Sequence, residues 1–203
     1  MTENLRNTLR KNIRSKRNLL TKASQLKASQ GLTKQLTCHP NVLSANRIAI
    51  YLTNDGELDP HPFIQWCWQQ GKEVYLPVIH PFNKHNLLFL RYKSDTVLIK
   101  NRFNINEPKL NVIDVCPSNK LDIIFTPLVA FDKTGARLGM GGGFYDRTLS
   151  SWYNNLTKSV NYYPIGLAHD CQEVEQIPVE CWDIPLPEII TPTKKLQTKF
   201  LTK

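Results

Sequence analysis

Short apolar runs of strand type alternate with amphipathic segments along most of this chain. The expected strands are residues 47–52, 73–79, 87–92, 122–130, 163–168 and 188–191, with residues 87–92 on one edge. Short helices are expected over residues 63–70, closed by Gly71, and over residues 144–153. Alternation of this kind is typical of an α/β protein, in which helices cover both faces of a mainly parallel sheet. The pattern therefore predicts a three-layer α/β/α sandwich whose ligands bind beyond the carboxyl ends of the strands.

The first part of the chain has a different pattern. Residues 4–30 contain few helix breakers, and we expect one long helix there. An apolar and a basic stripe run along it: Leu5, Leu9 and Ile13, then Arg6, Arg10, Arg14 and Arg17. Because residues three and four apart share a helix face, docking through the apolar stripe would place the arginines along the edge of a cleft. One more short helix is expected between Gly31 and Asn46, a stretch that Pro40 interrupts.

Composition narrows the class of protein. The 203 residues suit a single domain, residues 1–203, with 41% hydrophobic and 21% charged residues, as in globular proteins. No apolar run is long enough to cross a membrane, and the polar, basic N-terminus does not resemble a secretory signal. The five cysteines include no Cys-x-x-Cys pair, which argues against a zinc site or a disulfide framework. A cytoplasmic protein is the expectation.

Much of the formal net charge of +9 lies at the two ends of the chain. A basic helix within residues 1–30 carries one part, and a basic tail over residues 194–203 carries the other. Charge of this kind attracts nucleic acid, a membrane surface or a small polyanion. For the tail we expect the simpler alternative, a loose and solvated segment.

Five of the nine glycines lie within residues 135–147. They are Gly135, Gly139, Gly141, Gly142 and Gly143. A buried-type strand precedes them and a helix follows, an arrangement that directs free backbone N–H groups at an anion. Arg137 and Arg147 add positive charge at the two ends, and the Asp146 carboxylate could hold a metal ion. The run predicts a phosphate-binding loop, although it lacks the Walker and dinucleotide patterns; the alternative is a flexible surface loop.

The run Arg137-Leu-Gly-Met-Gly-Gly-Gly-Phe-Tyr-Asp-Arg147 resembles the signature loop of the 5-formyltetrahydrofolate cyclo-ligase family. Further segments resemble the same family in order: residues 5–21, 55–59, 107–108, 121–132, 177–185 and 190–192. The resemblance implies ATP-driven closure of 5-formyltetrahydrofolate to 5,10-methenyltetrahydrofolate, with release of ADP and phosphate through a phosphorylated formyl intermediate. It also implies the fold shared by sugar-phosphate isomerases and coenzyme A transferases. This chain departs from many members by having Phe144 in place of Tyr and Arg6 in place of Lys.

The resemblance further implies roles for particular residues. Asp146 and Arg147 are the expected catalytic residues, and Asp146 and Asp183 the expected Mg²⁺ ligands. Nucleotide contacts are expected from two helix arginines and the loop: Arg6, Arg10, Arg137, Leu138, Gly139, Met140, Gly141, Gly142, Gly143, Phe144 and Tyr145. Folate contacts are expected from Leu52, Glu57, Met140, Gly141, Gly142, Gly143 and Phe144. Two simpler alternatives stay open: Asp183 could cap a turn, and Glu57 could be a solvated loop carboxylate.

The expected partners are ATP and 5-formyltetrahydrofolate, bound by a monomer that uses neither nucleic acid nor a membrane. Two other functions stay open on the residues alone. One is nucleic-acid binding by the basic helix and tail, although no nucleic-acid-binding motif is present. The other is a sugar-phosphate or acyl-CoA enzyme on the same fold, because a fold does not determine its chemistry.

Overall fold

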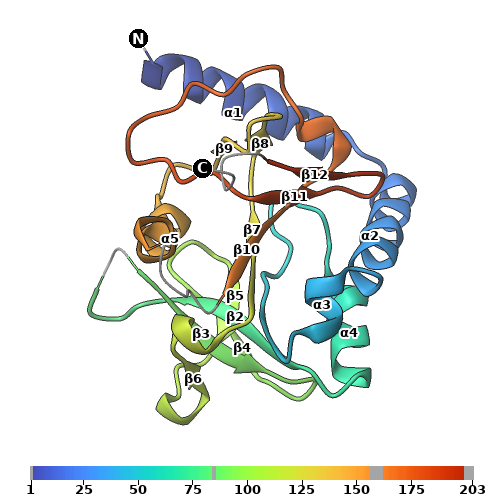
Figure 1. Ribbon diagram of the computed structural model, residues 1–203, viewed down its shortest axis with the longest axis vertical. Coiled ribbons are helices and arrows are strands. Elements are labelled where there is room, and N and C mark those ends of the chain that lie inside the picture. The colour runs from blue at the N-terminus through green and yellow to red at the C-terminus, as the bar shows by residue number, and fades with distance from the viewer. Residues whose placement is uncertain (1, 84–85, 156–161, 199–203) are drawn as a thin grey trace.

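The computed structural model describes residues 2–83, 86–155 and 162–198, and its centre is one eight-stranded sheet (Figure 1). The strand order is β12-β11-β10-β7-β1-β2-β3-β6. In chain order the strands are β1 (Arg47–Ala49), β2 (Glu73–Ile79), β3 (Leu87–Tyr92), β6 (Val115–Cys116), β7 (Ile123–Pro127), β10 (Tyr163–Leu167), β11 (Glu188–Ile190) and β12 (Lys195–Gln197). The five central strands from β11 to β2 are parallel, and the outer pairs are antiparallel. The sheet is therefore mixed, with the expected parallel arrangement in its centre.

Helices cover both faces of the sheet. α2 (Lys22–Thr37), α3 (Pro40–Ser44) and α4 (His61–Gln69) lie on one side, and α5 (Phe144–Asn154) lies on the other (Figure 1). Side chains of each strand alternate between the two cores: Ile48 and Ile50 pack with α2, α3 and α4, whereas Ala49 packs with the core beneath α5. Because both sides of the central strands are buried, these strands are apolar throughout, and the apolar pattern predicted the strands and the helices that cover both faces of the sheet.

The segment expected on an edge, residues 87–92, forms β3 but lies one strand in from the edge. The outer neighbour is β6, which pairs with Phe89 and Leu90. The edge position was wrong because a strand of two residues leaves no alternating pattern in a sequence.

The N-terminal helix is shorter than expected. α1 (Thr2–Asn18) ends before Thr21, whose hydroxyl accepts a hydrogen bond from the Ser24 N–H at 3.1 Å and caps α2. The single helix expected over residues 4–30 is therefore wrong. Gly31 lies inside α2, where a Cβ would stand 2.9 Å from the Pro192 carbonyl oxygen, so this glycine permits close packing of the helix instead of ending it.

A hairpin separates β7 from the glycine loop. β8 (Ala130–Phe131) and β9 (Arg137–Leu138) pair with each other in a small antiparallel sheet beyond the end of β7. Gly135 belongs to the turn of this hairpin, where φ is +86° and a Cβ would stand 2.4 Å from the Leu186 carbonyl oxygen. The strand expected over residues 122–130 is confirmed over Ile123–Pro127, but it does not continue to residue 130, and Gly135 is not part of the loop.

The basic tail is partly ordered. Residues Lys195–Gln197 form β12 along β11, and the Lys194 ammonium pairs with the Glu173 carboxylate. A loose tail is therefore wrong for this part, and residues 199–203 lie outside the described residues. Among the described helices, none has the length and apolar character that a membrane span requires. All five cysteines are free thiols.

Candidate functional site

The glycine loop of residues 139–143 joins β9 to α5 and leaves its backbone donors free. Gly141 has a φ of +95° and Gly143, which caps α5, has a φ of +64°, so both use the left-handed region. Between described residues, no hydrogen bond uses the backbone N–H groups of residues 139–143. The first N–H groups of α5 also have no partner within the helix, because no turn precedes them. This row of donors at a helix N-terminus is the geometry that binds phosphate.

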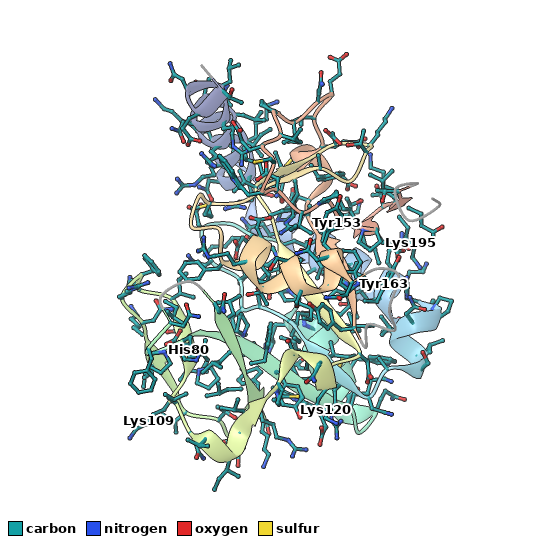
Figure 2. All side chains as sticks on the ribbon, turned by 60° about the vertical axis from the view of Figure 1, so that its left-hand side comes forward. His80, Lys109, Lys120, Tyr153, Tyr163 and Lys195 are labelled. Carbon is teal, nitrogen blue, oxygen red and sulfur yellow. The ribbon has the colours of Figure 1, made fainter. Side chains whose placement is uncertain are left out.

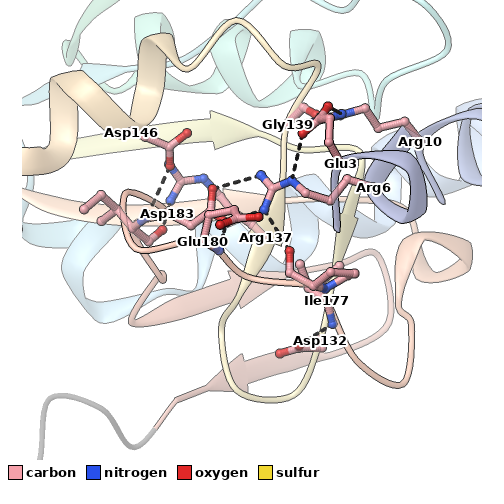
Figure 3. A network of polar contacts seen from close by, with 12 residues as sticks. Glu3, Arg6, Arg10, Asp132, Arg137, Gly139, Asp146, Ile177, Glu180 and Asp183 are labelled. Carbon is pink, nitrogen blue, oxygen red and sulfur yellow. Dashed lines mark hydrogen bonds and ion pairs between the residues drawn. The ribbon is translucent and has the colours of Figure 1, made fainter. Parts of the chain in front are cut away.

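Two arginines of α1 reach the region of the loop. Arg6 donates to both carboxylate oxygens of Asp183, at 2.5 and 3.0 Å, and its pKa is raised by these bonds (Figure 3). Arg10 Nε donates to the Gly139 carbonyl oxygen at 3.0 Å, and Arg10 Nη1 pairs with Glu3 at 3.0 Å. Arg10 therefore lies beside the glycine loop and Arg6 beside Asp183, while a cleft at this end of α1 stays a prediction.

The residues through which α1 packs on the rest of the protein differ from the expected apolar stripe. Ile13 is 2% exposed, but Leu5 is 61% exposed, while Arg6 and Arg17 are 5% and 0% exposed. Docking through Leu5 is therefore wrong. The buried face of α1 carries arginines because each of them meets a carboxylate of another segment, and a buried charge requires such a partner.

Arg137 lies beneath the loop and is almost fully buried. Its Nη2 donates to Asp146 Oδ1 at 2.7 Å, and its Nη1 donates to the Ile184 carbonyl oxygen. The Ile184 N–H also donates to Asp146 Oδ1, at 3.3 Å, whereas Oδ2 makes no hydrogen bond with a described residue. Burial lowers the pKa of Arg137, against the raising effect of Asp146. Arg137 therefore orients Asp146 so that one carboxylate oxygen is held and the other is available.

Arg147 lies on the exposed side of the same loop. Its guanidinium donates to the Gly142 carbonyl oxygen and stands 5.5 Å from the centre of the Phe144 ring. The other loop side chains differ in exposure: Met140 is 52% exposed, Tyr145 is half-buried, and Leu138 is fully buried in the core under α1. The Leu138 carbonyl oxygen accepts a hydrogen bond from the Val129 N–H, and its expected contact with the nucleotide stays a prediction.

Asp183 has two roles in the structure. Its Oδ2 accepts a hydrogen bond from the Glu180 N–H at 2.9 Å, which confirms that it caps a turn, and it pairs with Arg6 (Figure 3). Its place as a metal ligand stays a prediction. Among the described residues, no group of three His, Cys, Asp or Glu could hold a metal. Two aspartates with phosphate oxygens and water are nevertheless a common Mg²⁺ environment.

Glu57 lies in the turn that follows β1. The side chain is half-buried, and its Oε2 accepts a hydrogen bond from the Asn54 N–H at 3.1 Å. Burial raises the pKa of Glu57 to about 7, although the nearby charge of Arg17 lowers it. The carboxylate is therefore partly removed from solvent, and its role as a folate ligand stays a prediction. Leu52, at the end of the same strand segment, packs against the adjoining core.

The sequence analysis predicted neither a place for Phe103 near the site nor the hairpin that contains this residue. β4 (Leu98–Lys100) and β5 (Asn106–Pro108) form this hairpin, and the Phe103 ring lies 6.1 Å from the Phe144 ring in an edge-to-face arrangement. The hairpin thus contacts the first residue of α5, next to the glycine loop. No local pattern around Phe103 predicts this contact, because the contact depends on how the β4–β5 hairpin packs against α5.

Two surface hollows lie elsewhere and do not belong to this site. One, of about 480 Å³, is lined by Arg91 and Lys109, and the other, of about 320 Å³, by Arg91 and Lys120. Lys109 and Lys120 mark the end of the molecule opposite α1 (Figure 2). The glycine loop, the α1 arginines and Glu57 remain the candidate functional site.

These contacts describe an α/β protein with a glycine loop at the start of a helix, and the backbone N–H groups of this loop make no hydrogen bond with described residues. The family model of 5-formyltetrahydrofolate cyclo-ligases matches residues 2–192, and the chain belongs to this family. It is 52% identical to the 5-formyltetrahydrofolate cyclo-ligase of Escherichia coli strain K12 over 182 residues, which are 90% of this chain and 97% of the relative. The Haemophilus influenzae protein of the same name is 51% identical over 94% of this chain and 99% of its own length.

Solved structures agree with the fold. The NMR structure of Aquifex aeolicus 5,10-methenyltetrahydrofolate synthetase has a TM-score of 0.78 and 29% identity, covering 95% of this chain and 92% of its own. A 5,10-methenyltetrahydrofolate synthetase from Mycoplasma pneumoniae has a TM-score of 0.70 over 92% of this chain and 98% of its own. At 23% identity the latter supports the fold alone.

Proposed function

We propose that this protein closes 5-formyltetrahydrofolate to 5,10-methenyltetrahydrofolate with ATP, and releases ADP and phosphate. The observation that carries the proposal is the free row of backbone donors in residues 139–143, within a chain that belongs to the cyclo-ligase family. The more detailed fold assignment, to the sugar-phosphate isomerase and coenzyme A transferase group, is part of the same proposal. The cytoplasmic location and the monomeric state also remain predictions.

The chemical difficulty is the amide oxygen of the formyl group, which is a poor leaving group. Transfer of the γ-phosphoryl group to this oxygen releases ADP and creates an imino-phosphate. N10 then attacks the formyl carbon and loses its proton, and phosphate leaves with the oxygen. Phosphoryl transfer needs mainly positioning and charge stabilisation. The loop N–H groups would hold the phosphates, Arg10 and Arg147 would neutralise their charge from two sides, and Arg6 would act from the base of the site.

The carboxylates suit a magnesium ion. Asp146 presents an Oδ2 without a hydrogen bond to a described residue, and Asp183 lies in the same network of buried arginines (Figure 3). When bound, the ion would be held by Asp146 and Asp183 and would supply positive charge that stabilises the phosphoryl group during transfer. Arg137 keeps Asp146 oriented, and Arg6 limits the repulsion that two ionised carboxylates would otherwise suffer.

The folate would bind between the glycine loop and the turn after β1. The Glu57 carboxylate can accept charge-assisted hydrogen bonds from the pterin ring, and Leu52 offers an apolar wall. Met140 and Phe144 would border the rest of the ligand, together with the Phe103 ring. Nucleic-acid binding has less support, since Arg6 and Arg17 of the basic stripe are buried against carboxylates.

Thermal unfolding with single ligands tests this proposal. We expect MgATP and 5-formyltetrahydrofolate each to raise Tm, because each binds only the folded state. Arg10→Gln should reduce the shift caused by MgATP and leave the shift caused by the folate unchanged. An RNA oligonucleotide and a sugar phosphate are the controls. A shift with RNA, together with none from either substrate, would contradict the proposal.

A further inference from the structure

Arg17, in the last turn of α1, has a buried guanidinium group that makes few hydrogen bonds. It is 0% exposed, and its Nη2 donates to Asp55 Oδ2 at 2.8 Å. Its Nε and Nη1 are buried without a hydrogen-bond partner among the described residues. Such an arrangement is expensive, because desolvation and unsatisfied donors offset much of the attraction in a buried ion pair. Stability alone therefore does not account for a charge here.

Arg17 and Asp55 tie the end of α1 to the turn that carries Glu57. Asp55 also accepts from Arg14 Nε at 2.7 Å, and it has a φ of +50°, an unusual value for a residue with a side chain. The next residue, Gly56, has a φ of +71°, and a Cβ there would stand 2.2 Å from the Asn18 side-chain oxygen. The turn thus lies directly on the helix end, in a conformation that needs an outside constraint.

Groups from several elements interact electrostatically with Glu57 or bond to its backbone. They are Arg17 from α1, Asp55 from its own turn, Tyr51 just after β1, Tyr145 from α5, and His169 at the start of η3 (Asp170–Gln172). Arg17 is the only cation in this group that stays charged at neutral pH, since burial and Arg17 lower the pKa of His169. After burial, Arg17 has the largest effect on the pKa of Glu57, which it lowers, whereas Asp55 raises it.

We propose that Arg17 is a positioning residue for the folate: through its buried hydrogen bond to Asp55 it fixes the turn that carries Glu57. The inference rests on the proposed function of Glu57 in binding the pterin. Arg17 does not touch the substrate in this account. It acts from beneath the turn, while Arg6 and Arg10 at the other end of the same helix serve the nucleotide side.

Steady-state kinetics of four variants tests the inference. Arg17→Met removes the charge and keeps the side-chain length, and Asp55→Asn removes the carboxylate but leaves Arg17 in place. We expect each to raise KM for the folate by about tenfold, the value of a lost charged hydrogen bond, with KM for ATP unchanged. Arg17→Lys should recover part of the loss. The matched control is Arg47→Met, which breaks the exposed pair with Glu73 at the other end of β1 and should change neither constant.

The pH dependence separates positioning from simple loss of structure. With saturating ATP, the folate KM of the wild type should change near pH 7, where Glu57 titrates. In Arg17→Met the inflection should move to higher pH, because the cation that favours the ionised form is gone. In Asp55→Asn it should move to lower pH, because a like charge is gone. A general loosening of the fold would not shift the two profiles in opposite directions.

The outcomes distinguish this inference from the proposed function. If Glu57→Gln weakens the folate but Arg17→Met behaves like Arg47→Met, the inference is wrong and the role of Glu57 stands. If Glu57→Gln does not change KM for the folate, the role of Glu57 is wrong, and the inference about Arg17 is wrong as well. In the double variant with Glu57→Gln, Arg17→Met should add no further loss. An additive loss would contradict action through Glu57.

Discussion

Asp146→Asn is expected to lower kcat/KM for ATP by about a hundredfold and to raise the magnesium concentration needed for half-maximal activity. The substitution keeps the shape but removes the charge that Oδ2 presents to the ion. It also leaves the buried Arg137 without its ionic partner, so unfolding must be measured in parallel. Added magnesium should restore part of the activity, which it would not do for a protein that has lost its fold.

A magnesium titration at fixed ATP makes the comparison. Asp183→Asn should shift the curve less than Asp146→Asn, because both oxygens of Asp183 already accept hydrogen bonds from Arg6. The matched control is Asp114→Asn in η1 (Val112–Asp114), where the carboxylate only accepts from Asn111 at 2.8 Å. Titration curves of Asp146→Asn and Asp114→Asn that both coincide with the wild type would remove Asp146 from the metal site.

Glu57→Gln is expected to raise KM for the folate between about ten- and a hundredfold while KM for ATP stays unchanged. The physical reason is that a carboxylate forms charge-assisted hydrogen bonds with the pterin N–H groups, and an amide does not. Because burial raises the pKa of Glu57 to about 7, the ionised form is lost as the pH falls through this value. The folate KM of the wild type should therefore rise as the pH is lowered.

The variant should show no such pH dependence. Calorimetry with the folate alone gives the same information without turnover, and MgATP binding in the same variant is the control for folding. A Glu57→Gln protein that binds the folate as tightly as the wild type at about pH 8 would exclude the pterin-binding role.

The elements predicted well are those with a long, regular pattern. β2 begins and ends where the apolar run does, and α5 starts at Phe144 directly after the glycines. Among the shorter elements, β1 and β11 were predicted because they lie within the longer expected strands 47–52 and 188–191. β6, β8, β9 and β12 were missed or misplaced, since two or three residues by themselves carry no period. The break between α1 and α2 was missed because Thr21 is a cap only once the chain turns there.

The site was predictable where its chemistry lies in one segment and not where it depends on tertiary contacts. The glycine loop carries its own signal in consecutive residues. The partners of the α1 arginines lie far away in the chain, 38 residues from Arg17 to Asp55 and 177 from Arg6 to Asp183, and no local pattern connects them. The pairing of these arginines with distant carboxylates therefore depends on the fold and could not be predicted from the basic stripe.

The most direct measurement is the near-ultraviolet absorbance of the purified protein mixed with 5-formyltetrahydrofolate and MgATP. We expect absorbance of 5,10-methenyltetrahydrofolate to appear only when both substrates and magnesium are present, with one ADP and one phosphate for each product. Omission of ATP, or its replacement by ADP, should abolish the signal. A folded protein that produces no methenyltetrahydrofolate, or that hydrolyses ATP without forming it, would contradict the proposed function.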